Sequence, residues 1–180
     1  MRLFHVSEES DISLFYPRLP ARRDLDQTIG LVWAIDENRL PNFLTPRNCP
    51  RIAYYIGPQT TAQDAAAYFP DRRVRVVVTI EEAWAARHAH ATLYLYEFDP
   101  KDFVLQDDVA GYYVAQTPQT PVSRRRIDDL PHALRECGAQ LRTAESLWPL
   151  ADEITKTSLN WSLCRMAYAQ PRKDAPRPLP

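Results

Sequence analysis

Glycine is scarce in this sequence, whereas proline is abundant. The 180 residues include 4 glycines and 16 prolines. Phosphate-binding loops of the Rossmann and P-loop types need clustered glycines, because only a residue without a side chain lets the backbone close around phosphate. No such cluster occurs here, which excludes both kinds of loop. The prolines fix the backbone of the connecting segments and break the chain into short elements.

Cysteines and long apolar runs are also few. Cys49, Cys137 and Cys164 are widely separated and lack the paired spacing of zinc or redox sites, so we expect reduced structural thiols and no metal. No uncharged apolar stretch is long enough to cross a bilayer, and the N-terminus lacks the apolar core of a secretory signal. The sequence therefore predicts a cytoplasmic protein without a membrane partner.

Opposite charges are nearly balanced, and apolar residues are plentiful. Twenty-two Lys and Arg residues face 23 Asp and Glu residues, a formal net charge of -1, and 45% of all residues are hydrophobic. This balance provides no general attraction for nucleic acid, which makes such a partner unlikely, and the apolar content is enough for a core. We expect one globular domain over residues 1–170 and a disordered proline-rich tail over 171–180, and the sequence leaves the oligomeric state open.

Alternating hydrophobicity predicts most of the strands. The clearest patterns cover 74–80 and 91–98, with a short helix expected between them over 81–87. Weaker patterns predict further strands at 2–6, 30–36, 51–56, 102–105, 111–115 and 122–127. Strands and helices do not alternate regularly, so the predicted fold class is α+β with small, mostly antiparallel sheets.

Capping residues predict three further helices. Thr60 and Gln63 form a capping-box pattern before an alanine-rich segment that ends at Pro70. Asp129 can cap a helix that ends at Gly138. Ser146 can cap another, and its apolar spacing is compatible with a helix that continues through Leu159, Leu163 and Met166. The C-terminal end is therefore expected to be helical.

The first strand carries two polar residues on one face. His5 and Ser7 alternate with Phe4 and Val6, so the imidazole and the hydroxyl are expected to point to the same side. Inside a core both groups need buried partners, whereas at a cleft they can bind ribose hydroxyls and a carboxamide. Either a core histidine with a satisfied hydrogen bond or a ligand-binding strand fits this pattern.

Other polar or aromatic positions each have two interpretations. Tyr55 ends a strand before the alanine-rich helix and can offer a stacking surface, or it can pack in the core. Asp107 and Asp108 follow a strand and form either a solvated turn or a site near a reaction centre.

His88 and His90 are expected on one strand face without a third metal ligand at a recognisable spacing. The arginine run 124–126 is expected to be a solvated edge.

The chain resembles two known groups of proteins. The stretches "LFHVSEESDI", "GLVWAIDENRLPNFLTPRNCPRIAYY", "DDVAGYYVA" and "SLWPL" resemble a bacterial family known only as a domain of unknown function. The order of a His-x-Ser strand, Tyr-Ile before an alanine-rich helix, and "LYLYEFDPKDFVLQDD" followed by "PVSRRRI" is similar to the rifampin ADP-ribosyltransferases. That second resemblance implies an ADP-ribosyltransferase-like fold, in which two small sheets hold NAD.

The resemblance also implies roles for individual residues. His5 matches the first-strand histidine, Tyr55 the tyrosine that stacks on nicotinamide, and Asp107 or Asp108 the acidic residue after the late strand. Ser7 would then bind ribose with His5, and Arg47 or Arg51 would pair with the diphosphate. Val6 departs from the family's His-Gly-Thr pattern, because it stands where glycine lets the backbone approach the ligand.

The expected function is therefore an NAD-binding ADP-ribosyltransferase-like protein that transfers ADP-ribose to a small molecule or a macromolecule. Breaking the bond between nicotinamide and ribose develops oxocarbenium character, which a carboxylate stabilises. The alternatives are a non-catalytic module on the same fold that binds a nucleotide or a protein, and an enzyme similar to RNA 2′-phosphotransferases. The last of these needs a basic groove for RNA phosphates, which the balanced charge does not favour.

Overall fold

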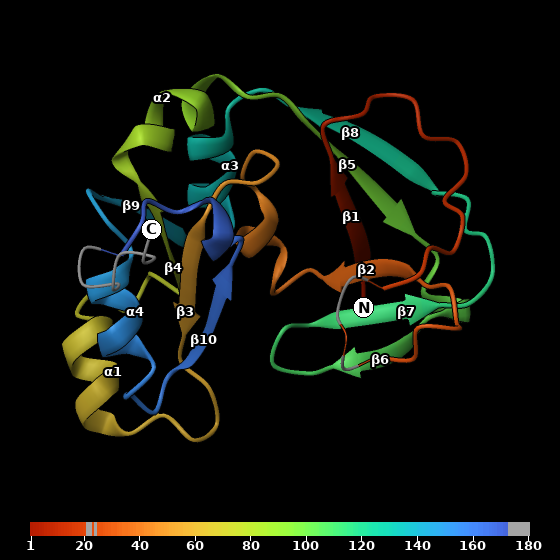
Figure 1. Cartoon of the computed structure of the whole chain (residues 1–180). Coiled ribbons are helices and arrows are strands. Elements are labelled where there is room, and N and C mark those ends of the chain that lie inside the picture. Colours follow the sequence, from red (N-terminus) through yellow and green to blue (C-terminus); the bar gives the residue numbers. More distant parts are fainter. Residues whose placement is uncertain (21–22, 24, 173–180) are drawn as a thin grey trace, which may run out of the picture. The chain divides into compact units, whose positions relative to one another are not determined.

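Two β-sheets and four α-helices make up an α+β fold (Figure 1). The computed structural model describes residues 1–20, 23 and 25–172. Contacts divide the chain into two compact units, which we call unit 1 (Met1–Arg47 and Ala89–Ala133) and unit 2 (the described residues of Asn48–His88 and Leu134–Pro180). Across the described ranges, no helix combines the length and the apolar character that crossing a membrane requires.

Unit 1 contains a six-stranded sheet in the order β6-β7-β2-β1-β5-β8, in which every pairing is antiparallel. A strand had been expected in each of these six regions and is found there, although β6 begins two residues later than the predicted 102–105. Their bounds are β1 Leu3–Ser7, β2 Val32–Asp36, β5 Leu93–Phe98, β6 Val104–Asp107, β7 Tyr112–Ala115 and β8 Ser123–Ile127. Two 3-10 helices, η1 (Leu40–Phe43) and η2 (Pro100–Asp102), belong to the same unit.

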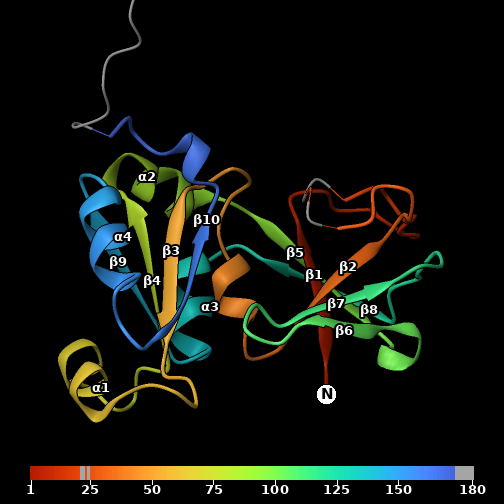
Figure 2. The same cartoon turned by 60° about the horizontal axis from the view of Figure 1, so that its bottom comes forward.

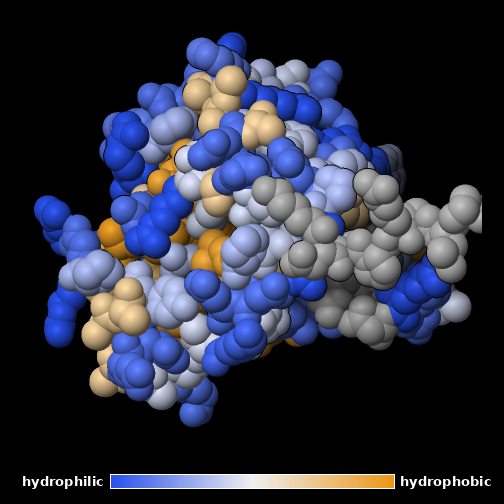
Figure 3. Space-filling model, turned by 60° about the vertical axis from the view of Figure 1, so that its left-hand side comes forward, coloured by the Kyte–Doolittle hydropathy of each residue, from blue (hydrophilic) through white to orange (hydrophobic). Residues whose placement is uncertain are grey.

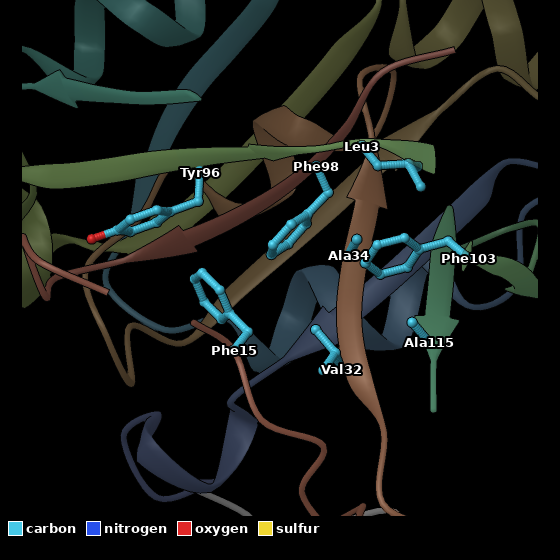
Figure 4. Packing of buried hydrophobic residues seen from close by; sticks show 8 residues of the cluster. All are labelled: Leu3, Phe15, Val32, Ala34, Tyr96, Phe98, Phe103 and Ala115. Atoms are coloured by element: carbon cyan, nitrogen blue, oxygen red, sulfur yellow. The ribbon is translucent and has the colours of Figure 1, made fainter. Parts of the chain in front are cut away.

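Apolar residues on one face of this sheet form the core of unit 1 (Figure 4). Phe15 comes from the segment before β2, and its ring lies 5.0 Å from that of Phe98 and 5.2 Å from that of Tyr96, both nearly edge-on. Aromatic pairs in this arrangement add to the stabilisation that burial alone gives. The remaining buried members of the cluster are Leu3, Val32, Ala34, Phe103 and Ala115.

Unit 2 contains a four-stranded sheet in the order β10-β3-β4-β9 (Figure 2). The strands are β3 Arg51–Tyr55, β4 Val76–Glu81, β9 Ala139–Ala144 and β10 Asn160–Cys164. β4 and β9 are parallel, and the other pairs are antiparallel. The unit also holds α1 (Ala62–Tyr68), most of α2 (Glu82–His90), α4 (Trp148–Ile154) and the 3-10 helix η3 (Met166–Tyr168), and α3 (Leu130–Glu136) runs across the unit boundary.

The core of unit 2 lies between its sheet and α4. Ile52 and Tyr54 of β3 and Val77 of β4 share one face of the sheet, because paired residues of neighbouring antiparallel strands point the same way. This face packs against buried residues of the α4 segment, Leu147, Ala151 and Ile154. Figure 3 brings the side with α1 and α4 forward, where apolar residues lie in small groups among hydrophilic ones.

The C-terminal half differs from the expected helices. β9 was not predicted, although "AQLRTA" alternates. The continuation of the last helix through Leu159, Leu163 and Met166 is wrong: α4 ends at Ile154, and Asn160–Cys164 forms β10. Leu159 and Leu163 both pack in the core, one before the strand and one within it. Helical spacing and strand alternation coincide at these positions, and pairing with β3 favours the strand.

Two local predictions also need correction. The helix after β3 is capped by Thr61, whose Oγ1 accepts a hydrogen bond from the Asp64 N–H at 3.2 Å, and not by Thr60. The Thr60 hydroxyl instead accepts from the Gly57 N–H at 2.8 Å. His88 and His90 lie at the end of helix α2 and not on a strand, so His88 is buried and His90 exposed. The predicted Asp129 cap of α3 is confirmed, because Oδ1 accepts from the His132 N–H at 2.8 Å.

The predicted tail falls partly outside the structure. Residues 173–180 lie outside the described residues, whereas Pro171 and Arg172 lie within them.

Candidate functional site

Three neighbouring strands of unit 1 place polar side chains on one face of the sheet. Residues that pair directly across antiparallel strands point to the same face. The register of β1, β5 and β8 therefore aligns two rows of side chains on the face that carries the core. We call these six residues the polar strip; one row is His5, Tyr96 and Arg124, and the other is Ser7, Tyr94 and Arg126.

The imidazole of His5 has a defined orientation. Its Nδ1 lies 3.1 Å from the carbonyl oxygen of Trp33, and its ring lies 4.9 Å from that of Phe15. Because a carbonyl only accepts, a neutral ring must carry its proton on Nδ1, which leaves Nε2 as an acceptor. Burial lowers the pKa of His5 below the ordinary 6.5, and the Trp33 contact opposes this only in part. His5 is therefore a neutral acceptor at neutral pH.

Residues 8–12 run along the polar strip and are bound by it. The Tyr96 hydroxyl donates to the Glu9 carbonyl at 2.7 Å and accepts from the Ile12 N–H at 3.1 Å. The Ser7 Oγ accepts from the Glu9 N–H at 3.0 Å, and Arg124 donates to the Ser10 carbonyl. The strip thus holds this segment on the sheet. The Ser7 hydroxyl still has its own proton to donate.

The outer row of the strip is more accessible. Tyr94 is half-buried, and Arg126 is exposed. The Arg126 Nε donates to Asp128 Oδ1 at 2.8 Å, and the same oxygen accepts from the Thr92 hydroxyl at 2.8 Å. These two hydrogen bonds lower the pKa of Asp128, with the Thr92 contact as the larger cause. This end of the strip combines an aromatic surface with a guanidinium group, which suits a planar ring next to an anion.

Asp107 and Asp108 do not join His5 on this face. Asp107 pairs with Tyr112, Tyr112 with Ile35, and Ile35 with Phe4. The row that contains Asp107 therefore points to the face opposite His5. Three strand spacings separate β6 from β1, about 14 Å. Asp107 Oδ1 accepts from the Ala110 N–H at 2.9 Å in the turn after β6, and Asp108 is exposed.

The two candidate arginines have different surroundings. Arg47 is exposed, and its backbone N–H donates to Glu8 Oε1 at 2.8 Å, next to the polar strip residue Ser7. Arg51 belongs to unit 2 and is only 6% exposed. Its Nη1 donates to the Cys49 carbonyl at 3.1 Å. The neighbouring Cys49 thiol is also buried, and burial is the main reason that its pKa rises to about 12.

Tyr55 shares its strand face with Arg51. Both alternate with Ile52 and Tyr54 along β3, so they lie on the face opposite the α4 core. Tyr55 is 4% exposed, so its ring is buried. His5, Ser7, Arg47, Asp107 and Asp108 lie in unit 1, whereas Arg51 and Tyr55 lie in unit 2.

Sequence reasoning missed four residues of the polar strip. Tyr94 and Tyr96 alternate within "LYLYEF", and Arg124 and Arg126 alternate within "SRRRI". The period of two shows that each pair shares a face, but it does not show which strands are neighbours. The arginine run lies exposed on the edge strand β8, as predicted, and the pairing adds that Arg124 and Arg126 project to the His5 face. Across residues 1–20, 23 and 25–172, no three side chains form a group that could hold a metal ion.

Comparison with known proteins gives a family. A model of a family of unknown function, DUF6886, matches residues 4–169. The chain belongs to this family. The match includes β1 with His5 and extends past η3, so it covers both sheets. No curated protein and no solved structure matches the chain.

Proposed function

We propose that this DUF6886 protein binds NAD through the β1 face of unit 1 and transfers ADP-ribose from it, on an ADP-ribosyltransferase-like arrangement of its sheets. The observation that carries the proposal is the state of His5, a neutral imidazole whose Nδ1 is fixed by the Trp33 carbonyl while Nε2 is left as an acceptor. A ribose hydroxyl can donate to Nε2, and the Ser7 hydroxyl can donate to a second ribose oxygen.

Charged and aromatic side chains at the strip support a nucleotide as the ligand. A diphosphate needs guanidinium groups. The exposed Arg47 is close to the strip, because its backbone N–H donates to Glu8, the residue after Ser7. Planar bases need an aromatic surface, which the half-buried Tyr94 offers within unit 1. Tyr55 and Arg51, which the resemblance also assigns to NAD, remain predictions for unit 2, and Tyr55 is included in the test of transfer below.

NAD binding is tested by calorimetric titration of the purified full chain. The informative variant is His5→Asn, because its amide N–H can keep the bond to the Trp33 carbonyl while the Nε2 acceptor is lost. We expect NAD affinity to fall at least about tenfold, the effect of one lost hydrogen bond in a partly buried site. His90→Ala is the matched control, since His90 is exposed at the end of α2, and it should bind like the wild type. Equal affinity of His5→Asn and wild type contradicts the proposal.

Transfer is tested by release of nicotinamide from NAD, with Asp107→Asn, Asp108→Asn and Tyr55→Phe beside the wild type. We expect wild-type release, and its loss in the variant that removes the stabilising carboxylate. If a variant releases nicotinamide at the wild-type rate, the substituted group is not needed for catalysis. Circular dichroism of each variant separates a lost activity from a lost fold.

A non-catalytic nucleotide-binding module is the second candidate. One observation favours it: the row of Asp107 points away from the His5 face, and Asp108 is exposed in the following turn. A ligand on the polar strip is then bound without a carboxylate of this pair beside it. Saturable NAD binding that depends on His5, without nicotinamide release under any condition tried, identifies this function.

A further inference from the structure

A buried carboxylate in unit 2 binds the backbone of the C-terminal segment. Glu81 is the last residue of β4 and is 1% exposed. Its two oxygens accept from the Gln170 N–H at 3.0 and 3.1 Å. Removing a carboxylate from water is costly unless hydrogen-bond donors replace the water. The Gln170 N–H is therefore a partner that Glu81 needs.

The carbonyl group of Gln170 is also held by a side chain. Trp148 Nε1 donates to the Gln170 carbonyl oxygen at 2.7 Å. Glu81 and Trp148 thus bind the N–H and the C=O of one residue. Both contacts are made to the backbone, and the Gln170 side chain takes part in neither of them. Any residue other than proline can satisfy this pair of contacts at the same place.

The residue before Gln170 has an extended backbone. Ala169 has φ -70° and ψ 159°, close to polyproline II values. Pro171 fixes its own φ and keeps Gln170 out of the helical region. A polyproline II segment forms no internal hydrogen bonds, so its N–H and C=O groups are free to be bound by a protein surface. Surfaces that recognise such peptides are lined with aromatic side chains.

A basic residue completes the contact. The Arg172 guanidinium lies over the Trp148 ring at 5.1 Å from its centre, and it forms an ion pair with Asp152 of α4. The indole therefore donates a hydrogen bond from its N–H and stacks with a cation on its face. Pro171 and Arg172 are exposed, so the segment lies on the surface of unit 2 and not inside it. The contacts are made to the Gln170 backbone and the Arg172 side chain, with Pro171 between them, so the bound pattern is any residue other than proline, then Pro, then Arg.

We propose that Glu81, Trp148 and Asp152 form a recognition site for a polyproline II peptide of a partner protein with the sequence x-Pro-Arg, which residues 169–172 occupy in cis. The charges fit this partner, because Asp152 and the indole face both select a cation. The sequence holds four more Pro-Arg pairs, namely Pro17–Arg18, Pro46–Arg47, Pro50–Arg51 and, outside the described residues, Pro176–Arg177. The segment of the chain competes with the partner, and its removal strengthens partner binding.

The site exchanges occupants and does not stay vacant. A vacant site leaves the Glu81 carboxylate without its Gln170 donor, and a buried acceptor that loses its partner is destabilising. An incoming peptide must therefore offer an N–H at the residue before its proline. This requirement separates specific recognition from a general attraction between an arginine peptide and Asp152.

The test measures binding of a fluorescent peptide, acetyl-Ala-Gln-Pro-Arg-Lys, to the full chain by anisotropy. The double substitution Gln170→Pro and Arg172→Ala weakens the binding of residues 169–172 to the site, because it removes the backbone N–H at 170 and the guanidinium group at 172. We call this variant the weakened chain. Gln170→Ala with native Arg172 is the matched control, because it keeps both. We expect the weakened chain to bind the peptide at least about tenfold more tightly than wild type and control do.

Two further probes test whether the peptide binds through Glu81 and Trp148. A peptide methylated on the Gln nitrogen lacks the N–H for Glu81 and should bind the weakened chain at least about tenfold less tightly. Trp148→Phe in the weakened chain keeps a ring but loses the indole donor, and it should also reduce binding. Equal binding of both peptides, or no binding by a weakened chain that circular dichroism shows to be folded, overturns the proposal. A concentration-dependent dimer without peptide binding overturns it in favour of exchange between two copies.

Discussion

Two buried hydroxyl groups, one from each sheet, differ in their hydrogen bonds. In unit 1 the Tyr96 hydroxyl is bound by the Glu9 carbonyl and the Ile12 N–H. In unit 2 the Thr79 Oγ1 of β4 is buried and has no hydrogen-bond partner among the described residues. The difference lies in what each hydroxyl faces: backbone groups of residues 9 and 12 bind the Tyr96 hydroxyl, whereas apolar side chains around α4 pack on the face of Thr79. A hydroxyl stabilises a sheet only where its cover offers polar atoms.

The largest effect is expected when the hydroxyl of Tyr96 is removed. Tyr96→Phe leaves the Glu9 carbonyl and the Ile12 N–H without this partner, and we expect it to lower the free energy of unfolding by about 2 kcal/mol. Tyr94→Phe is the matched control, because Tyr94 is on the same strand face and half-buried. Urea unfolding measures both. Equal losses in the two variants mean that the loop contacts do not stabilise unit 1.

The opposite sign is expected for Thr79. Thr79→Val keeps the shape of the side chain and removes a buried hydroxyl that lacks a partner, so we expect the free energy of unfolding to rise by about 1–2 kcal/mol. The same urea titration measures the change. A decrease shows that the Thr79 hydroxyl has a partner, such as a water molecule, and the contrast between the two sheets is then lost.

A smaller loss is expected at the start of α1. Thr61→Ala removes the oxygen that accepts from the Asp64 N–H, and loss of such a cap lowers the free energy of unfolding by about 1 kcal/mol. Gln63→Ala should have little effect, because the capping box predicted from Thr60 and Gln63 does not form. Thermal unfolding of both variants checks the assignment, and a larger effect at Gln63 rejects it.

The smallest effect is the pH dependence that His5 contributes. Its pKa in the folded chain is lower than the ordinary 6.5, so well above pH 6.5 the ring is neutral in both states and contributes no slope. As pH falls below 6.5, the unfolded chain binds a proton that the folded chain resists, and stability decreases. We expect His5→Asn to show a shallower decrease between pH 7 and 5 than wild type. Identical slopes show that His5 is not shielded from water.

Most of unit 1 could be predicted from local patterns. Its strands alternate between apolar and polar residues, and a period of two is a strong signal when one face is buried. The shared face of His5 and Ser7 follows from the same alternation and is confirmed by their partners on β5. The order of the strands is not contained in this pattern, because alternation within a strand says nothing of its neighbours. The polar strip and the separation of Asp107 from His5 both depend on that order.

Unit 2 shows why local patterns fail where a strand pairs with a segment far away in the sequence. The spacing of Leu159 and Leu163 fits a helix and a strand equally well, and the pairing with β3 decides between them. β9 runs parallel to β4, which needs a long connection and cannot be inferred from the segment alone. Glu81 looks like the polar end of a strand in the sequence. Only the return of the chain to Gln170 shows that its carboxylate is buried and bound.

The sequence by itself determined the fold class, most of the strands, and the side of β1 to which His5 and Ser7 point. These depend on neighbours within a few residues, where steric preference and the alternation of burial act directly. Tertiary structure alone decided the protonation state of His5, the rows of the polar strip, and the contacts of Glu81 with the C-terminal segment. The physical reason is that burial and hydrogen-bond partners come from residues far apart in the chain, and the energies of polar groups depend on both.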